Sequence, residues 1–393
     1  MQAFTQYTPT EIIFGRGAEN KTGELVKKYK GTKVLVVYGG KSAVSSGLIQ
    51  RIANQLKNEN IGYILFGGAK PNPGLSLVNE GIKIAIDNKI DFILAVGGGS
   101  AIDTGKVIAW GALVPGLDVW KFFLKEAEAE KALPVGTVLT ISAAGSETSN
   151  SAVITNEQTG EKRGLTAELN RPCFAVMDPE LTYTLPKFQV SCGIADIMMH
   201  TLERYFTNTE GNELTDEIAA ALLRVVIRNG EKLLLDSHNY DAASEIMWAG
   251  SLSHNGLTGL GRPMDFSVHQ FGHELSAKFD VAHGAALTAM WGSWAKYCCH
   301  KDYARFAKYA VDVWGVDMKN AQNTAFAGID KTVGYFRQIN MPACFTELGI
   351  GILNSEEINE LADRCVFRGK RKIGNFYPLD KQDVINVYNM ANR

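Results

Sequence analysis

Short apolar runs alternate with amphipathic segments through the first half of the chain. KVLVVY (33–38), IGYILF (61–66) and DFILAV (91–96) predict strands, and the apolar spacing between them predicts helices over about 45–57 and 75–88. A strand-helix-strand order repeated in this way is typical of a parallel sheet with helices on its faces. The pattern therefore predicts a β-α-β-α-β core in the first hundred residues.

Further strand-like runs follow, and then the pattern changes. VGTVLTI (135–141), SAVIT (151–155) and CFAVMD (173–178) continue the predicted sheet, whereas later segments carry apolar residues three and four positions apart. That second spacing is typical of helices that bury one face. We therefore expect a Rossmann-like α/β domain over residues 1–186 and an all-α domain over residues 187–393.

Length and composition agree with two globular domains. The 393 residues exceed what one core of ordinary size holds, and 46% apolar with 21% charged residues is a globular composition. A formal net charge of −2 makes nucleic acid and anionic membranes poor partners, and no stretch reaches the roughly 18 apolar residues of a membrane span. The N-terminal MQAFTQYTPTEIIFG has no signal or transit character, so we expect a cytoplasmic protein that acts on a small molecule.

A glycine-rich turn follows the third predicted strand. The residues Gly97–Ser100 (GGGS) come directly after DFILAV and open a helix predicted over about 101–110. Glycine lets the backbone approach a phosphate, and the N–H groups at a helix N-terminus favour an anion. A plain tight turn explains GGGS equally well on its own, and the spacing departs from the G-x-G-x-x-G fingerprint. The turn is a candidate pyrophosphate site in a sheet that is not a standard Rossmann half.

The end of the first predicted strand bears on the choice of nicotinamide. It reads Tyr38-Gly39-Gly40-Lys41-Ser42, and the acid that many NAD sites place here is missing. A lysine and a serine close to a ribose 2′-phosphate favour NADP over NAD. A lysine that merely begins a surface helix is the other explanation for Lys41.

The histidines all lie in the second half of the chain. Asp196 and His200 are four residues apart, His269 and His273 repeat that spacing, and His283 follows. Residues four apart on a helix leave from one face, so such pairs can share an ion. Three imidazoles with one carboxylate suit Fe²⁺ or Zn²⁺, whereas Mg²⁺ and Ca²⁺ prefer oxygen ligands. Any one of these histidines could be an ordinary core or surface residue, and the clustering carries the prediction.

Five motifs spread over the chain occur together in one known family. They are GGGSxxD (97–103), AAGSET (143–148), DPELTYTLP (178–186), GIADIMMHTLERY and HQFGHELSAKFDVAHGAAL. Together they resemble the iron-containing alcohol dehydrogenase family, and within it the NADPH-dependent, butanol-dehydrogenase-like group. The resemblance covers nearly the whole chain. It implies an NADP(H)-linked alcohol dehydrogenase or aldehyde reductase for small primary alcohols and aldehydes such as butanol and butanal. It also implies Fe²⁺, or else Zn²⁺, and a homodimer.

The resemblance implies roles for individual residues. The metal ligands would be Asp196, His200, His269 and His283, whereas His273 would stand beside the nicotinamide without binding the metal. The imidazole of His273 also makes it the candidate for catalytic proton transfer to solvent, a structural role being the alternative. The dinucleotide would contact Gly97, Gly98, Gly99, Ser100, Asp103, Thr140, Ser142, Ser149, Lys162, Leu181 and Thr184. The end of the first predicted strand adds Gly39, Gly40, Lys41 and Ser42 as candidate contacts. Two of these, Lys41 and Ser149, depart from the usual family pattern.

Other functions fit parts of the sequence. A dehydroquinate-synthase-like or glycerol-dehydrogenase-like enzyme would have the same fold, and a metallohydrolase without nicotinamide would need the metal site alone. Gln270 stands where an H-E-x-x-H protease has its glutamate, which argues against a metalloprotease. In the expected reaction the metal polarises the substrate oxygen during hydride transfer, so net use of NAD(P)H separates these functions. The sequence leaves open the substrate chain length and the choice between iron and zinc.

Overall fold

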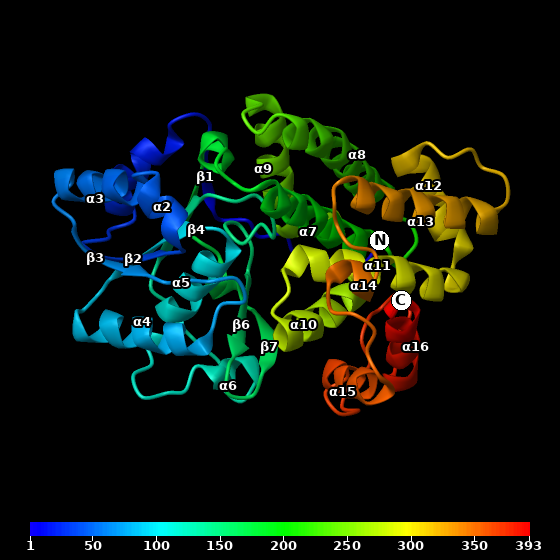
Figure 1. The fold of residues 1–393 in the computed structure, drawn as a ribbon. Coiled ribbons are helices and arrows are strands. Elements are labelled where there is room, and N and C mark those ends of the chain that lie inside the picture. The colour runs from blue at the N-terminus through cyan, green and yellow to red at the C-terminus, as the bar shows by residue number, and fades with distance from the viewer. The chain divides into compact units, whose positions relative to one another are not determined.

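The chain forms two compact units, which are described separately. The α/β unit contains Tyr7–Leu185 and Ser237–Ser251, and the helical unit contains Met1–Gln6, Pro186–Asp236 and Leu252–Arg393. The computed structural model describes residues 1–393 except for the side chain of Lys41 (Figure 1). Both units are therefore discontinuous in the sequence.

A six-stranded parallel sheet forms the centre of the α/β unit. Its order is β1-β8-β5-β4-β2-β3, and every neighbouring pair is parallel. The strands are β1 (Glu11–Phe14), β2 (Lys33–Tyr38), β3 (Gly62–Gly67), β4 (Phe92–Gly97), β5 (Val135–Leu139) and β8 (Phe174–Met177). β4 is buried along its whole length, as expected for a central strand covered on both faces. The predicted β-α-β-α-β core is confirmed.

Helices cover both faces of this sheet. They are α1 (Thr22–Lys28), α2 (Lys41–Ser45), α3 (Leu48–Asn58), α4 (Leu75–Asp87), α5 (Gly99–Gly111) and α6 (Trp120–Phe123). Successive side chains of a strand point to opposite faces, so Val34 and Val36 of β2 pack with α1 and α3, whereas Leu35 and Val37 pack with α4 and α5. The continuous apolar run of β2 is explained by these two cores.

The strand order changes direction between β2 and β4. After β2 the chain adds β3 on one side, and it then returns to place β4, β5 and β8 on the other. Open α/β sheets bind ligands at the carboxyl ends of the strands where the order reverses in this way. Tyr38 pairs with Val96, and Gly97 pairs with Leu139. The residues that follow β2, β4 and β5 therefore lie along one edge of the sheet.

Three strands differ from the sequence prediction, and Glu161–Thr166 (β7) is one that was not predicted. Ser151–Asn156 (β6) is a strand, but it pairs antiparallel with β7 (Glu161–Thr166) in a separate sheet rather than continuing the parallel one. The side chain of Asn156 accepts hydrogen bonds from the next backbone N–H groups and Gly160 has a φ of 65°, so the chain turns back at once. β1, which was not predicted, pairs with β8 at the sheet edge instead.

The second unit is helical, as predicted. Its helices are α7 (Lys187–Tyr205), α8 (Glu213–Leu235), α10 (Ser267–Phe279), α11 (His283–Cys298), α12 (Tyr303–Trp314), α13 (Ala321–Gln338), α14 (Phe345–Leu348), α15 (Ser355–Cys365) and α16 (Lys381–Ala391). α9 (Tyr240–His254) belongs to the α/β unit up to Ser251 and to the helical unit beyond it. Short 3-10 helices lie at Ala18–Lys21, Glu168–Asn170, Pro179–Thr182, Leu257–Gly259 and Cys299–Lys301.

α7, which carries two of the predicted site residues, is deeply buried over its second half. Its residues from Gly193 to Tyr205 are buried on every side, because α8, α10 and α11 pack around it. Such a helix fixes the direction of each side chain that it carries. Among the described residues, none of the helices combines the length and apolar character needed to cross a membrane.

Candidate metal centre and nucleotide site

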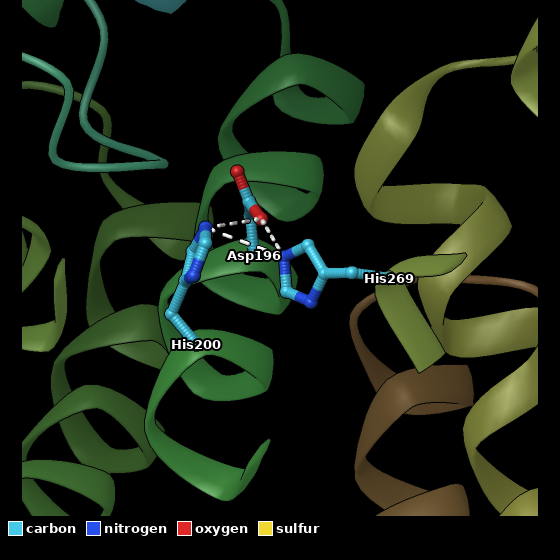
Figure 2. A group of neighbouring side chains, drawn as sticks. All are labelled: Asp196, His200 and His269. Carbon is cyan, nitrogen blue, oxygen red and sulfur yellow. Dashed lines mark hydrogen bonds and ion pairs between the residues drawn. The ribbon is translucent and has the colours of Figure 1, made fainter. Parts of the chain in front are cut away.

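Two of the predicted metal ligands lie on α7. Asp196 and His200 are one turn apart and point the same way, towards His269 of α10 (Figure 2). Nε2 of His200 lies 3.4 Å from Oδ1 of Asp196. Both residues are no more than 5% exposed, so the burial of these polar groups needs a compensating partner. The i,i+4 spacing in the sequence produces the pair directly.

His269 and His283 complete the group from two other helices. Nε2 of His269 lies 3.3 Å from Nε2 of His200 and 3.8 Å from Oδ1 of Asp196, and Nε2 of His283 lies 3.8 Å from the same oxygen. Ligand bonds of about 2.0–2.2 Å to a tetrahedral ion separate the ligand atoms by about 3.4 Å. The donor set and its spacing therefore fit a divalent ion, and the atoms of Asp196, His200 and His269 could share one.

Glu203 orients His269. Its carboxylate is fully buried, contacts Nδ1 of His269, and accepts the backbone N–H groups of Val268 (2.5 Å) and His269 (3.2 Å). With Nδ1 engaged, Nε2 turns towards Asp196 and His200. Ligating histidines commonly give their second ring N–H to such a carboxylate. The same carboxylate caps the first turn of α10, so the helix and the ring are fixed together.

His200 is enclosed by other rings and a cation. The ring of His254 stacks on it at 4.1 Å between centroids, and Nη1 of Arg204 donates to the His200 carbonyl at 2.7 Å. Burial, with the neighbouring His254 and His269, holds the pKa of His200 well below its usual value. A neutral imidazole is the form that binds a metal.

His273 lies beside this group. It is one turn after His269 on α10, and its ring is 6.2 Å from that of His269 and 5.5 Å from that of His283. The ring is half-buried. His273 therefore neighbours two predicted ligands. Like His283, it is not among the three residues, Asp196, His200 and His269, whose ligand atoms all lie within 4.8 Å of one another.

The glycine turn lies at the carboxyl end of β4, next to the point where the strand order reverses. A Cβ at Gly98 would lie 2.0 Å from Cγ2 of Ile141, so a side chain there would force Ile141 to move. A Cβ at Gly99, the first residue of α5, would meet nothing within 4 Å, and neither would one at Gly40 after β2. The turn thus combines close packing on one side with open space at a helix N-terminus, where a phosphate could approach.

A buried lysine lies on α5, the helix that begins at this turn. Lys106 of α5 is fully buried and donates to Oγ of Ser146 (3.0 Å), to the carbonyl of Ser149 (3.2 Å) and to the carbonyl of Ser151 (2.8 Å). Burial lowers the pKa of Lys106 to about 8, against the opposing charge of Asp103. The lysine ties the segment before β6 to the helix that begins at the glycine turn.

Asp103 lies one turn before this lysine. Its carboxylate accepts from Oγ of Ser146 at 2.5 Å and from the backbone N–H of Val153 at 2.9 Å, and burial raises its pKa. A carboxyl group keeps acceptor capacity beyond these two hydrogen bonds, whether it is ionised or protonated. Asp103 is thus oriented by the protein and still able to accept.

The other predicted cofactor residues are distributed more widely. The N–H of Thr140 donates to the carbonyl of Gly97 at 3.1 Å, which brings Thr140 and Ser142 to the glycine turn. Lys162 of β7 instead donates to Asn72 at 2.8 Å, in the loop that follows β3 at the same sheet edge. For four others the structure gives the burial. Ser149 is buried, Leu181 is half-buried, and Ser42 of α2 and Thr184 are exposed. The side chain of Lys41 lies outside the described part of the chain.

Two family sequence models cover almost the whole chain. The one described as iron-containing alcohol dehydrogenase matches residues 9–179, and the one for the C-terminal part of the Fe-containing alcohol dehydrogenase family matches residues 190–392. The chain belongs to the iron-containing alcohol dehydrogenase family. Members of this family are oxidoreductases that use a metal, iron or another, together with a nicotinamide cofactor.

Similar proteins place the chain in the butanol-dehydrogenase-like group of this family. NADH-dependent butanol dehydrogenase A of Clostridium acetobutylicum is 39% identical over 391 residues, which is 99% of each chain. NADPH-dependent aldehyde reductase YqhD of Escherichia coli is 33% identical over 393 residues and the full length of both. The crystal structure of NADH-dependent butanol dehydrogenase A from Thermotoga maritima matches with a TM-score of 0.95 and 33% identity, over 100% of this chain and 99% of that one.

Three residues of this family member were not found from the sequence. Glu203 follows His200 by three positions, so its place on the same helical face was a usable signal. His254 is not among the predicted ligands, yet its ring stacks on that of His200. Lys106 follows Asp103 by three positions, but nothing in the sequence shows that its ammonium group is buried.

Proposed function

We propose that this chain reduces small aldehydes to primary alcohols, and catalyses the reverse oxidation, on substrates of about butanal size, with NADPH preferred over NADH. The metal would be Fe²⁺ or Zn²⁺, held by Asp196, His200, His269 and His283. The observation that carries the proposal is the convergence of imidazole nitrogens on one buried carboxylate oxygen at 3.4–3.8 Å, in a chain of this family. One carboxylate with three neutral imidazoles suits these borderline ions.

The chain's own residues would do the positioning. Bound at this group, the metal would supply Lewis acidity towards the substrate oxygen, and a nicotinamide would supply or accept the hydride. Glu203 holds His269 in its tautomer and direction, and the buried α7 holds Asp196 and His200. His273, half-buried beside His269 and His283, is the proposed group for passing a proton to solvent.

The preference for NADPH is supported by the end of β2. Gly39 and Gly40 stand where an acid would bind the ribose hydroxyls of NAD and repel a 2′-phosphate. Similar proteins carry names with either cofactor, so the ratio of kcat/KM for NADPH and NADH decides the matter. Gly39→Asp, whose Cβ would make only ordinary contact with the Ala69 carbonyl at 3.5 Å, should move the ratio towards NADH. A wild-type protein that clearly prefers NADH would contradict the proposal.

The decisive experiment is an anaerobic NADPH-oxidation assay. The protein is reconstituted with Fe²⁺ or Zn²⁺ and supplied with a panel of linear aldehydes. We expect metal-dependent consumption of NADPH with a maximum near four carbons. Binding of both metal and NADPH without turnover of any aldehyde would reject the proposed function.

Two histidine variants separate the proposed roles. His269→Ala should lose metal and activity together, because it removes a ligand atom. His273→Ala should keep the metal and lose about 100-fold in kcat, the usual scale for general acid–base catalysis. His300→Ala, at an exposed position after α11, is the matched control and should change neither. Full activity in a metal-free His269→Ala protein would exclude this mechanism.

A further inference from the structure

Phe266 has an unusual backbone conformation. Among the non-glycine residues with positive φ, Lys30, Asn60 and Lys89 each follow the end of a helix, where a left-handed residue is common. Phe266 instead precedes the first residue of α10, and its φ is 59°. Residues in this position normally have extended backbone, and an aromatic side chain makes the left-handed region a strained one. Such strain persists only where the surroundings hold it, and it is found mostly at functional sites.

Two buried carboxylates hold this conformation. Oδ1 of Asp265 accepts the N–H of Ser267 at 3.0 Å, and its Oδ2 accepts two N–H groups from the loop before α16. The N–H of Asp265 donates to the carbonyl of Glu203 at 2.8 Å, and the Glu203 carboxylate accepts the N–H of Val268. The backbone is therefore anchored directly before and directly after Phe266.

The strained conformation directs the ring to the metal group. Its centroid lies 5.1 Å from the ring of His269 and 6.0 Å from that of His200, and the guanidinium carbon of Arg204 lies over it at 4.8 Å. His200, His269 and Arg204 are each 4% exposed, whereas Phe266 is half-buried. The ring is thus an accessible apolar surface among buried groups, directly beside two predicted ligands.

We propose that Phe266 is a specificity-determining residue whose ring forms the apolar wall beside the carbon chain of the substrate. The inference rests on the proposed function and extends it to the substrate class: unbranched aliphatic aldehydes and alcohols, which lie flat against a ring. A substrate branched next to the reacting carbon would collide with the ring. The left-handed backbone is retained because a relaxed residue would turn the ring away from His200 and His269.

The test compares a linear and a branched aldehyde. For wild type, Phe266→Leu and Phe266→Ala we measure kcat/KM with butanal and with 2-ethylbutanal, together with bound metal and Tm. Phe266→Ala should raise the branched-to-linear ratio about tenfold, the scale on which pockets discriminate one or two carbon atoms. Phe266→Leu should lie between the two. Phe326→Ala is the control, because it removes another half-buried phenylalanine side chain, on α13 near Tyr303. This variant should leave the branched-to-linear ratio unchanged.

A glycine variant tests the strain separately. Phe266→Gly should match the substrate ratio of Phe266→Ala but melt at a higher temperature, because glycine adopts positive φ without a steric penalty. An unchanged ratio in all three variants would overturn the proposal. So would loss of metal from both Phe266→Ala and Phe266→Leu, since that is the result expected of a ring that only supports the ligands.

The two proposals fail in different ways. If the wild-type protein turns over no aldehyde, the proposed function fails without reference to any variant. The role of Phe266 is then decided by thermal shift with 2-ethylbutan-1-ol as the probe. That alcohol should raise the Tm of metal-loaded Phe266→Ala more than that of wild type, and equal shifts would reject the apolar wall.

Discussion

The proposed metal group of the helical unit is made of side chains, whereas the proposed nucleotide turn of the α/β unit is made of backbone and open space. The metal group brings one carboxylate and three imidazoles together from α7, α10 and α11. At the turn, a side chain at Gly98 would collide with Ile141, and a Cβ at Gly99 would meet no described atom of the protein within 4 Å. Substitutions that remove side-chain atoms should therefore weaken metal binding, and substitutions that add them should weaken nucleotide binding.

Each site also depends on one buried ionisable residue, which is acidic at the metal group and basic at the glycine turn. Glu203 orients His269 and caps α10, and Lys106 ties the segment before β6 to α5. Neither residue is a proposed ligand of metal or cofactor. Variants of these two residues and of the turn should therefore separate the two sites in solution.

The largest effect is expected from Glu203→Ala. The change leaves the N–H groups of Val268 and His269 without their acceptor and frees the His269 ring. We expect metal affinity, measured by competition with a chelator, to fall about 100-fold, with a smaller fall for Glu203→Gln. Glu217→Ala, at an exposed position of α8, is the control. Equal loss of metal and of cofactor affinity in Glu203→Gln would show that the two sites are not independent.

A smaller effect, on cofactor affinity instead of metal affinity, is expected at the glycine turn. Gly99→Ala adds a methyl group where no protein atom lies within 4 Å, so Tm should stay unchanged while the Kd for the nicotinamide cofactor rises about tenfold. Gly98→Ala is its matched contrast, because its Cβ would lie 2.0 Å from Cγ2 of Ile141 and should lower Tm. If Gly99→Ala binds cofactor as tightly as wild type by fluorescence titration, the phosphate does not approach there.

The smallest effect is a pH dependence at Lys106. Burial lowers its pKa to about 8, so between pH 8 and about 10 the unfolded chain binds a proton that the folded protein has released. Folding stability from this group therefore rises with pH in that window. Relative to Lys106→Met, wild type should gain on the order of 1 kcal/mol in free energy of unfolding between about pH 7.5 and 9. Parallel pH profiles from urea titrations would contradict the lowered pKa.

The sequence predicted most of what depends on local pattern. Apolar runs marked β2, β3, β4, β5 and β8, and the i,i+4 spacing marked Asp196 with His200. Patterns of this kind indicate which residues are buried and which lie on the same face of a helix, and both properties depend on residues close in the sequence. The short edge strand β1 carries little of that signal, because its pairing with β8 depends on residues far along the chain.

The features that were missed depend on distant contacts. SAVIT has the composition of a sheet strand, but the turn at Asn156–Gly160 pairs it with β7 instead. Lys106 resembles any lysine on an amphipathic helix until the carbonyls of Ser149 and Ser151 surround it. The strain at Phe266 follows from anchors at Asp265 and Glu203, and no spacing rule reports it.

The discontinuous α/β unit has a consequence for the order of synthesis on the ribosome. Met247 of α9 packs in the same core as Ala95, Ile102, Leu139 and Met177. Nascent chains fold domain by domain as they emerge. The α/β unit, however, cannot complete its core until α9 has been made. By then Pro186–Asp236, which belongs to the helical unit, has already been synthesised. The sheet therefore stays partly uncovered until the ribosome has made α9, which begins at Tyr240, 63 residues after β8 ends at Met177.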